Sequence, residues 1–349
     1  MCGGKRVVSL FTGAGGLDLG FKLAGFNTIW ANEYDKSIWD TFRTNFPKTI
    51  LDTRSIVDVS SSEIPDSIGI IGGPPCQSWS EAGARRGIND HRGLLFYEYI
   101  RILEDKKPLF FLAENVPGIL APRHREAFEE ILCRFGELGY NVTHDLLNAH
   151  DYGVPQDRKR VIIVGYRKDM SKSFIPPDPL LIKPVLKEAI GDLPKPKPAL
   201  DKNKANPEGS LDIPNHEYFI GGFSTIYMSR NRVRGWDEPS YTIQAGGRHA
   251  PIHPQAPKMK LVERDKRIFI KGKEKLYRRL SVRECARIQT FPDEFVFKYD
   301  NVGDGYKLIG NAVPVEFAHY LATQIFKDVS AFLQKNKTPK NKKTPLRIK

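Results

Sequence analysis

The feature that most constrains this chain is the alternation of short apolar strands with amphipathic helices over residues 1–166. Four runs rich in β-branched side chains predict strands, at residues 7–10, 68–71, 109–113 and 161–166. Residues 125–138 carry Phe, Ile and Leu side chains at helical spacing. This pattern predicts an α/β fold with a mostly parallel sheet and helices on both faces. Ligands of such sheets bind at the carboxyl ends of strands, so the residues after each run are the candidates for chemistry.

The second half of the chain has a different composition. Seven prolines between residues 175 and 199 exclude a long helix or a central strand there, and residues 200–300 are polar, basic and weakly periodic. At 349 residues the chain is also long for one compact core. We therefore expect a first domain at 1–175, a small loop-rich domain at 176–300, a return segment at 301–334 whose helix packs on the first domain, and a basic disordered tail at 335–349.

The net charge of +13 is unevenly distributed. Residues 1–150 sum to −3 and residues 151–349 to +16, which predicts a polyanion partner for the second half. No apolar run approaches the roughly 20 residues that span a bilayer, and residues 1–10 lack the features of a signal peptide. The four cysteines stand far apart without a CxxC pair, which indicates neither a zinc cage nor a disulfide framework. We expect a cytoplasmic protein with no membrane contact and no metal.

A glycine-rich turn follows the first strand and contains Gly13, Gly15 and Gly16. Its backbone could approach a ligand closely because no Cβ stands in the way. Glu33 stands twenty residues beyond Gly13, where an acidic side chain would bind ribose hydroxyls. Asp18 occupies the place where a dinucleotide fingerprint requires glycine. The turn therefore indicates a nucleoside-containing cofactor, with a plain strand-to-helix connection as an equally open interpretation. Phe11 could either stack on an adenine or pack in the core.

Cys76 is the candidate nucleophile. It follows a strand through two glycines and two prolines, a stiff turn that would present its thiol at the carboxyl edge of the sheet. The polar residues 78–93 that come next have the composition of a loop that could close over a substrate. The other three cysteines, Cys2, Cys133 and Cys285, are expected to be small packing residues.

Two further groups could serve this thiol. Glu114 directly follows an apolar strand, so we expect poor solvation to raise its pKa and to let it donate a proton, although a helix N-cap would also explain it. Arg158 and Arg160 precede the fourth strand, and alternation would place them on one face. Two guanidiniums there could lower the pKa of the thiol and bind a carbonyl oxygen, whereas a surface charge run is the ordinary interpretation.

Six stretches in order resemble the cytosine-5 DNA methyltransferases. They are FTGAGG, GGPPCQSWS, ENV, QDRKR, RRLSVRECARIQTFPDEF at 278–295 and GNAVPV at 310–315, and they cover nearly the whole chain except the tail. The resemblance implies a Rossmann-like S-adenosylmethionine-dependent methyltransferase domain with a smaller target-recognition domain. It also implies methyl transfer to C5 of a cytosine flipped out of duplex DNA. Cys76 would add to C6, Glu114 would protonate N3, Asn115 would orient the site, and Arg158 with Arg160 would hold the carbonyl of the base and the loop.

The same resemblance implies where S-adenosylmethionine would bind. Its contacts would be Phe11, Gly13, Gly15, Gly16, Leu17, Glu33, Ser55, Ile56, Pro74, Asn311 and Val313, with Glu33 on the ribose and Ile56 against the adenine. One position departs from the family pattern. The family presents an aspartate to the adenine amino group 21 residues before the cysteine, and this chain has Ser55 there, with Asp52 out of register.

Residues 215–257 resemble the recognition segment of GGCC-specific modification methyltransferases of type II restriction-modification systems. Arg230, Arg232 and Arg234 alternate, and Arg248 follows a Gly-Gly turn. Arginine suits guanine because its donors fit O6 and N7, but phosphate contacts are equally ordinary. We expect base contacts from Arg232 and Arg248 above all, with Ser80 and Arg85 also at the DNA. The implied reaction is methylation of the inner cytosine of GGCC by a monomer in a bacterial cytoplasm, protecting that site from a cognate endonuclease.

Three other functions stay open from the sequence. The glycine turn alone would suit a nicotinamide-dependent oxidoreductase, against which Asp18 and the Cys76 motif argue. A non-catalytic DNA-binding relative would keep the fold, and the departure at Ser55 is the reason to consider it. A tRNA cytosine-5 methyltransferase would keep the chemistry on another substrate, although the long arginine-rich region 200–300 favours duplex DNA.

Overall fold

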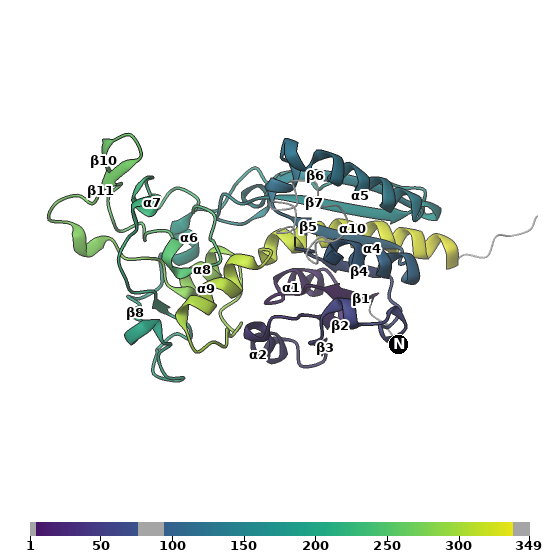
Figure 1. Cartoon of the computed structure of the whole chain (residues 1–349), viewed down its shortest axis with the longest axis horizontal. Coiled ribbons are helices and arrows are strands. Elements are labelled where there is room, and N and C mark those ends of the chain that lie inside the picture. Colours follow the sequence, from purple (N-terminus) through teal and green to yellow (C-terminus); the bar gives the residue numbers. More distant parts are fainter. Residues whose placement is uncertain (1–4, 76–93, 338–349) are drawn as a thin grey trace, which may run out of the picture.

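A computed structural model describes residues 5–75 and 94–337 of the chain. Figure 1 shows two lobes. The sheet lobe is built on strands β1 to β7, and the small lobe contains helices α6 to α9 and the short strands β8 to β11. The long helix α10 (Val315–Lys337) leaves the small lobe and runs along the sheet.

The sheet has seven strands in the order β3-β2-β1-β4-β5-β7-β6. The strands β3, β2, β1, β4 and β5 are all parallel to one another. Strand β7 is antiparallel to both β5 and β6. The predicted α/β class with a mostly parallel sheet is therefore confirmed, as are the four predicted strands; β3 and β6 were not predicted. The bounds are β1 Lys5–Leu10, β2 Phe26–Asn32, β3 Ile50–Asp52, β4 Gly69–Gly72, β5 Phe110–Asn115, β6 Tyr140–Asn148 and β7 Lys159–Arg167.

The reversed direction of β7 decides which of its residues reach the carboxyl edge of the sheet. In the register of the pair, Asn115 at the end of β5 lies opposite Val161 near the start of β7, and Glu114 lies opposite Ile162. The first residues of β7, rather than its last, therefore stand beside the carboxyl end of β5. This places Arg160 at the same edge as Glu114 although the two belong to opposite ends of their strands.

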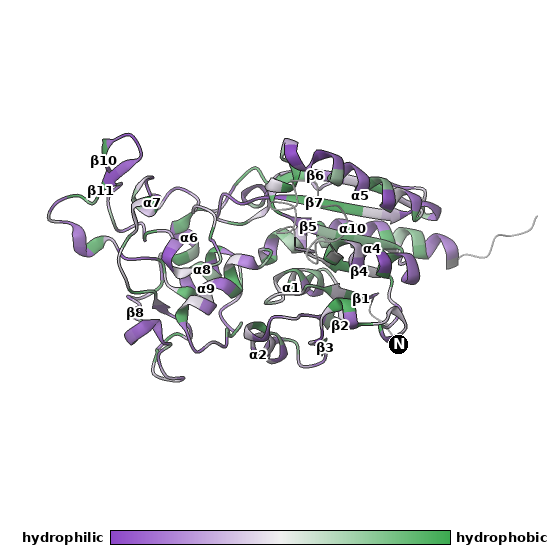
Figure 2. Cartoon of the chain, viewed as in Figure 1, coloured by the Kyte–Doolittle hydropathy of each residue, from purple (hydrophilic) through white to green (hydrophobic). Residues whose placement is uncertain are grey.

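Each face of the sheet is covered by two helices. On one face, α1 (Gly16–Leu23) and α10 bury Phe21, Phe317 and Leu321 against Val7 and other strand residues. On the other face, α4 (Leu94–Lys106) and α5 (Arg125–Glu137) pack against the alternate strand residues, such as Val8. Successive side chains of a strand point to opposite faces, so both faces of these strands are apolar. Figure 2 shows this concentration of hydrophobic residues on the strands.

The small lobe has little regular structure. Its elements are α6 Leu186–Ile190, β8 Lys197–Pro198, β9 Glu217–Tyr218, α7 Thr225–Met228, β10 Lys260–Glu263, β11 Lys266–Ile268, α8 Val282–Ile288 and α9 Val302–Asn311. Its main core unites α6, α8 and α9 with Phe42 and Phe46, at the α2 (Lys36–Asn45) end of the sheet lobe. A second, smaller cluster lies around Tyr227 and Tyr277.

The return segment divides between the two lobes. Helix α9 packs in the main core of the small lobe, whereas α10 packs on the sheet as expected for a returning helix. The domain limits at 175 and 300 stay a prediction. Among the described residues, no helix is both long and apolar enough to cross a membrane.

Candidate active site

The glycine turn after β1 is built from unusual backbone angles. Phe11, Gly13 and Gly15 have φ values of 55°, 57° and 88°, in the left-handed region that favours glycine. A Cβ on Gly13 would meet no atom of the described residues within 4 Å. A Cβ on Gly16 would lie 2.2 Å from the carbonyl oxygen of Val313. Among the described residues, one side of the turn is therefore left unfilled, and the other touches the return segment.

Asp18 stabilises this turn through side-chain hydrogen bonds. Its fully buried carboxylate accepts hydrogen bonds from Ser9 Oγ at 3.1 Å and Thr12 Oγ1 at 2.5 Å. Burial raises the pKa of Asp18, and these hydrogen bonds partly oppose that shift. The residue that departs from the dinucleotide fingerprint thus links β1 to its own turn.

Glu33 is held at the end of β2 by two backbone groups. Gly13 N donates to its Oε2 at 2.9 Å, and Asp35 N donates to its Oε1 at 2.8 Å. Burial is the main cause that raises the pKa of Glu33. Each carboxylate oxygen has a second lone pair, so the group can still accept from a ligand hydroxyl.

Ser55 and Ile56 lie beside the end of β3. Ile56 opens the short 3-10 helix η1 (Ile56–Asp58) and is buried in the core with Trp30. The carboxylate of Asp52 is engaged by Arg54, at 2.6 Å, and this ion pair holds the pKa of Asp52 below its usual range. The Asp52 carboxylate is therefore already paired with a guanidinium.

Asn115 ties the end of β5 to the turn that precedes Cys76. Its Nδ2 donates to the carbonyl oxygen of Pro74 at 3.0 Å, and its Oδ1 accepts from Val116 N at 2.9 Å. A Cβ on Gly73 would lie 3.3 Å from Glu114 Oε2. The carboxylate is thus fixed beside this turn. Cys76, Ser80 and Arg85 lie outside the described residues.

Glu114 and Arg160 form an ion pair at the carboxyl edge of the sheet. Arg160 Nε lies 2.8 Å from Glu114 Oε1, and each side chain is only 11% exposed. The sequence predicts that the Glu114 side chain is poorly solvated, and it identifies no partner for it. The side chain is indeed poorly exposed, but the Arg160 guanidinium supplies a counter-charge.

Arg158 precedes the first residue of β7. That it shares a face with Arg160 stays a prediction, and the charges of Arg160 and Glu114 are near enough to affect its pKa. Its fully buried guanidinium donates to three backbone oxygens, from Nη1 to Ile243 at 3.2 Å and from Nη2 to Gly310 and Ala312 at 2.9 Å each. Burial lowers the pKa of Arg158 to about 9. The side chain joins the sheet lobe to two distant segments of the chain.

The three alternating arginines of the recognition segment are also not equivalent. Arg232 donates to the carbonyl oxygen of Tyr227 at 2.8 Å and that of Ile226 at 3.3 Å. Arg234 pairs with Asp157 at 2.9 Å. Residues 229–235 form no strand, Arg230 is exposed, and Arg232 and Arg234 are half-buried on either side of the buried Val233. That all three project to one side stays a prediction.

Two other arginines of this segment are exposed. Arg230 and Arg248 both lie at the surface of the small lobe. Arg248 belongs to the short helix η8 (Gly247–His249) and lines a cavity of about 460 Å³. The turn at Gly221 and Gly222 lines the same cavity. Because Arg248 is exposed and lines this cavity, it is the arginine of the recognition segment that is best placed to contact a ligand.

Sequence reasoning missed two residues that shape this region. Arg279 donates to the carbonyl oxygens of Gly221 at 3.0 Å and Gly222 at 2.8 Å, so it holds the turn that lines the cavity with Arg248. The buried Gln156 accepts from Ile243 N at 3.1 Å through its Oε1. Arg279 lies in the stretch 278–295 and Gln156 in the stretch QDRKR, so membership in these motifs was a signal that the residues matter. The motifs do not indicate which backbone groups the two side chains bind.

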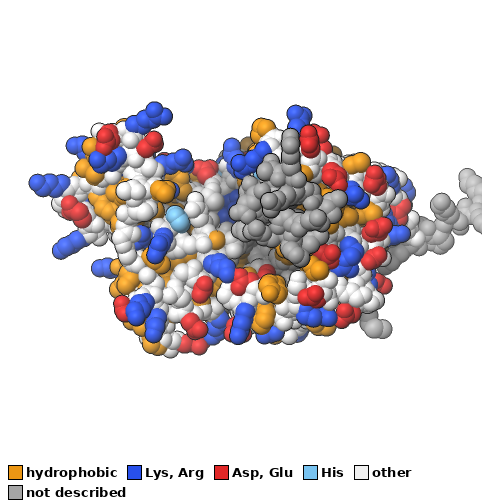
Figure 3. Space-filling view, in the orientation of Figure 1, with side chains coloured by type: hydrophobic (Ala, Val, Ile, Leu, Met, Phe, Trp, Pro, Cys, Tyr) orange, Lys and Arg blue, Asp and Glu red, His pale blue; other side chains and the backbone are white. Residues whose placement is uncertain are grey.

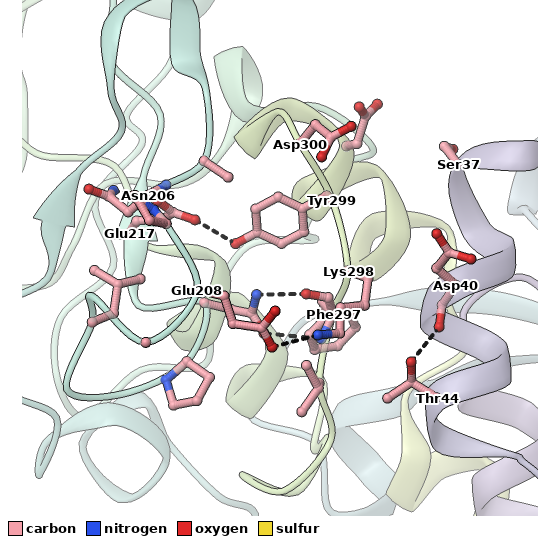
Figure 4. Close-up of a pocket in the computed structure, with 18 of the residues that line it drawn as sticks. Ser37, Asp40, Thr44, Asn206, Glu208, Glu217, Phe297, Lys298, Tyr299 and Asp300 are labelled. Carbon is pink, nitrogen blue, oxygen red and sulfur yellow. Dashed lines mark hydrogen bonds and ion pairs between the residues drawn. The ribbon is translucent and has the colours of Figure 1, made fainter.

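Another cavity lies away from these residues. It encloses about 1070 Å³ between α2, residues 205–217 and residues 296–304, and none of the predicted site residues that the structure describes lines it. Figure 4 shows two interactions in its lining, the hydrogen bond from the Tyr299 hydroxyl to Glu217 at 3.0 Å and the ion pair of Lys298 with Glu208. Its lining carries acidic and basic side chains together, which favours no single class of ligand.

Known proteins resemble the chain over nearly its whole length. The family model described as C-5 cytosine-specific DNA methylase matches residues 5–327. Type II methyltransferase M.MthTI of Methanothermobacter thermautotrophicus is 58% identical over 327 residues, covering 94% of this chain and 98% of that protein. Type II methyltransferase M.FnuDI of Fusobacterium nucleatum is 56% identical over 324 residues, covering 92% and 94%.

The solved structures agree in fold. A putative DNA modification methyltransferase encoded within a prophage of E. coli superimposes with a TM-score of 0.72 at 24% identity, covering 93% of this chain and 99% of that one. A Dnmt2 mutant of Spodoptera frugiperda gives 0.64 at 18% identity, covering 94% and 99%. At these identities the likeness establishes the fold.

Proposed function

This chain belongs to the C-5 cytosine-specific DNA methylase family, and from that premise we propose that it methylates the inner cytosine of GGCC in duplex DNA. The modification would protect the DNA from a cognate restriction endonuclease, because its relatives are type II methyltransferases. The observation that carries the proposal is the cluster at the carboxyl edge of the sheet. Glu114 is paired with Arg160 and lies beside the turn that leads to Cys76, and Asn115 fixes that turn.

The proposed chemistry follows from the reactivity of cytosine. Its C5 is a poor nucleophile until a group adds to C6, and the Cys76 thiolate would form that bond. Glu114 would bind N3 and donate a proton to it, with Arg160 keeping the carboxyl group in place and binding the carbonyl oxygen of the base. C5 would then attack the methyl carbon of S-adenosylmethionine, and S-adenosylhomocysteine would be the leaving group. Loss of the C5 proton to a base, expulsion of the Cys76 thiolate and return of the N3 proton to Glu114 would restore the ring. The target base must leave the helix, because stacking blocks access to C5 and C6.

The methyl donor of the family is S-adenosylmethionine, which supplies an electrophilic methyl group when it is bound. The residues present fit its nucleoside. Among the described residues nothing fills the space where a Cβ on Gly13 would stand, and Glu33 is held beside it by Gly13 N with lone pairs left for ribose hydroxyls. Ile56 is only 2% exposed, so its contact with the adenine rests on the family resemblance. We propose contacts from Phe11, Gly13, Gly15, Gly16, Leu17, Glu33, Ser55, Ile56, Pro74, Asn311 and Val313.

Recognition of the sequence would depend first on Arg248. It is exposed, and it lines a cavity of the small lobe together with the turn that Arg279 holds. Arg230 is exposed as well and is assigned to base or phosphate contacts. Arg232 would first have to release the two carbonyl oxygens that it binds, so we assign it a supporting role in the free enzyme. One monomer could modify the two strands of a palindromic site in turn.

Bisulphite sequencing tests this proposal. A mixed-sequence duplex incubated with the enzyme and S-adenosylmethionine should gain 5-methylcytosine at the inner cytosine of GGCC and at no other cytosine. Methylation at other cytosines would refute the GGCC assignment, and preference for tRNA in a competition assay would refute duplex DNA as the substrate. The variant Cys76→Ser should bind the duplex but transfer no methyl group; retained transfer would refute the role of Cys76.

A further inference from the structure

Three distant parts of the chain meet at the end of α9. Gly310 lies in the last turn of this helix, and a Cβ placed on it would stand 2.4 Å from the carbonyl carbon of Gln244 and 2.5 Å from the nitrogen of Ala245. Both neighbours precede Arg248 in the recognition segment. The helix and the recognition segment therefore touch backbone to backbone, with no side chain between them to absorb a movement.

Arg158 binds the same place from the sheet lobe. One guanidinium donates to Ile243, one residue before the contact with Gly310, and to the oxygens of Gly310 and Ala312. The Arg158 side chain is only 1% exposed, so water cannot easily reach the three carbonyl oxygens. Breaking these hydrogen bonds would therefore leave buried polar atoms unpaired, which is costly. Arg158 thus fixes the recognition segment and the end of α9 to each other as well as to the start of β7.

Hydrogen bonds on either side of Arg158 extend this attachment. Asp157 N donates to Ser240 O at 2.9 Å, Thr242 Oγ1 donates to Asp157 O at 2.5 Å, and Ile243 N donates to Gln156 Oε1 at 3.1 Å. The recognition segment is therefore attached along residues 240–243 to the short run that leads to Arg160 and so to Glu114.

The segment after Gly310 reaches the glycine turn. The carbonyl oxygen of Val313 would lie 2.2 Å from a Cβ on Gly16, so these two backbones also pack without a side chain between them. Residues 310–313 thus touch the recognition segment at one end and the proposed cofactor site at the other. Closely packed interiors transmit displacement because they contain little free volume.

We propose that residues 310–313 form a wall shared by the cofactor site and the recognition segment, and that Gly310 and Arg158 are positioning residues through which cofactor and DNA strengthen each other's binding. The inference rests on the proposed function, which supplies the two ligands. A ligand that displaces this wall also displaces the segment packed against it, so the second ligand meets a surface that is already in its bound position. The coupling is reciprocal, so it can be measured from either side.

The test compares binding of S-adenosylhomocysteine, which cannot react, with and without a saturating duplex that the wild-type enzyme methylates. Calorimetry should give the wild type a gain in affinity of about fivefold or more when the duplex is present. In Gly310→Ala the new methyl group pushes the recognition segment away from the wall. We expect the gain to fall below about twofold while the affinity without DNA stays near the wild-type value.

Gly305→Ala is the matched control. Gly305 belongs to the same helix, and a Cβ there would meet the Tyr299 ring at 2.7 Å rather than the recognition segment. This variant should be similarly overpacked and should keep the wild-type gain. Arg158→Lys is the second test variant, because a lysine keeps the charge but cannot bind the three carbonyl oxygens together; it should also lose the gain.

The outcomes separate this inference from the proposed function. A wild type that methylates DNA but shows no gain, or a folded Gly310→Ala that keeps the full gain, would overturn the shared wall and leave the proposed reaction intact. If Gly310→Ala does not fold, a full gain in Arg158→Lys overturns it. A wild type that methylates a sequence other than GGCC would refute the proposed specificity, and the coupling would then be measured on that sequence.

Discussion

The two lobes position their functional residues by different physical means. In the sheet lobe, Glu114 and Asn115 stand at the end of a strand whose backbone groups are paired on both sides. The small lobe has few paired strands, so many of its carbonyl oxygens need other donors. Buried arginines supply them: Arg279 binds two carbonyl oxygens, and Arg283 binds those of Pro214, Pro292 and Phe295.

This difference affects how the excess of basic residues is interpreted. Residues 151–334 carry a net charge of +9, which is part of the excess that predicts a polyanion partner. Part of that charge is internal, because Arg158, Arg279 and Arg283 are buried and bind backbone oxygens. Other basic side chains stand out from the outer edge of the small lobe, as Figure 3 shows. A basic domain can thus use arginine both as a scaffold and as a ligand-binding group, and only burial distinguishes the two uses.

The largest effect is expected in the sheet lobe. Glu114→Gln removes the proton donor while keeping the shape of the side chain, and general acid catalysis contributes about 10²- to 10⁴-fold. We expect kcat on a GGCC duplex to fall by a factor in that range, with little change in DNA affinity, as measured by tritium transfer and by fluorescence anisotropy. Unchanged kcat would show that the carboxyl edge of the sheet does not carry the chemistry.

A paired substitution in the small lobe separates its two kinds of arginine. Arg279→Ala removes a buried guanidinium that packs on the Phe223 ring and binds the carbonyl oxygens of the Gly221–Gly222 turn, which should cost about 1–3 kcal/mol of unfolding free energy. Arg248→Ala removes an exposed side chain and should leave stability unchanged, while weakening binding to GGCC by about 1–3 kcal/mol. Urea denaturation and anisotropy titrations measure both quantities. Equal stability of the two variants would contradict the distinction between scaffold and ligand-binding arginines.

Asp18 gives the sheet lobe a dependence of stability on pH. Burial raises its pKa in the folded state, so the folded protein binds more protons than the unfolded one between the two pKa values. The stability associated with this proton is present at low pH and is lost as pH rises through the folded pKa. The variant Asp18→Asn cannot titrate at this position, so it does not lose stability in this way. The difference in unfolding free energy, variant minus wild type, should therefore increase as pH rises above about 4. A difference that stays flat or decreases would show that the buried carboxyl group does not behave this way.

The smallest effect is expected from the tail. Deletion of residues 335–349 removes seven basic residues and no acidic one. Binding to DNA should then depend less steeply on salt concentration, because each lost phosphate contact reduces the slope by about 0.9. The methylated sequence should be the same as for the full chain. An altered site preference after deletion would mean that the tail takes part in recognition.

The sheet lobe was predictable because its signals are local. Apolar runs predicted β1, β4, β5 and β7, and the motif around Glu114 and Asn115 marked the correct edge. The direction of β7 was not predictable from its composition. It is this reversal that brings Arg160, near the start of its strand, to Glu114 near the end of another.

The small lobe was less predictable because its contacts join residues far apart in sequence. Alternation of Arg230, Arg232 and Arg234 has meaning only in a strand, and this segment has none. The partner of Arg234 lies at Asp157, and two of the partners of Arg158 lie beyond residue 300. No spacing rule identifies such pairs, so a buried guanidinium and an exposed one look the same in the sequence.

The position of α10 has a consequence for how the protein is made. This helix shares with α1 the task of covering the face of the sheet that contains Val7, yet it is synthesised after the whole small lobe. The part of that apolar face that α10 covers stays exposed while some three hundred residues leave the ribosome, because α10 does not yet exist. The sheet lobe therefore cannot finish folding before the small lobe has been synthesised. A nascent chain halted between the two would expose an aggregation-prone surface that chaperones must shield.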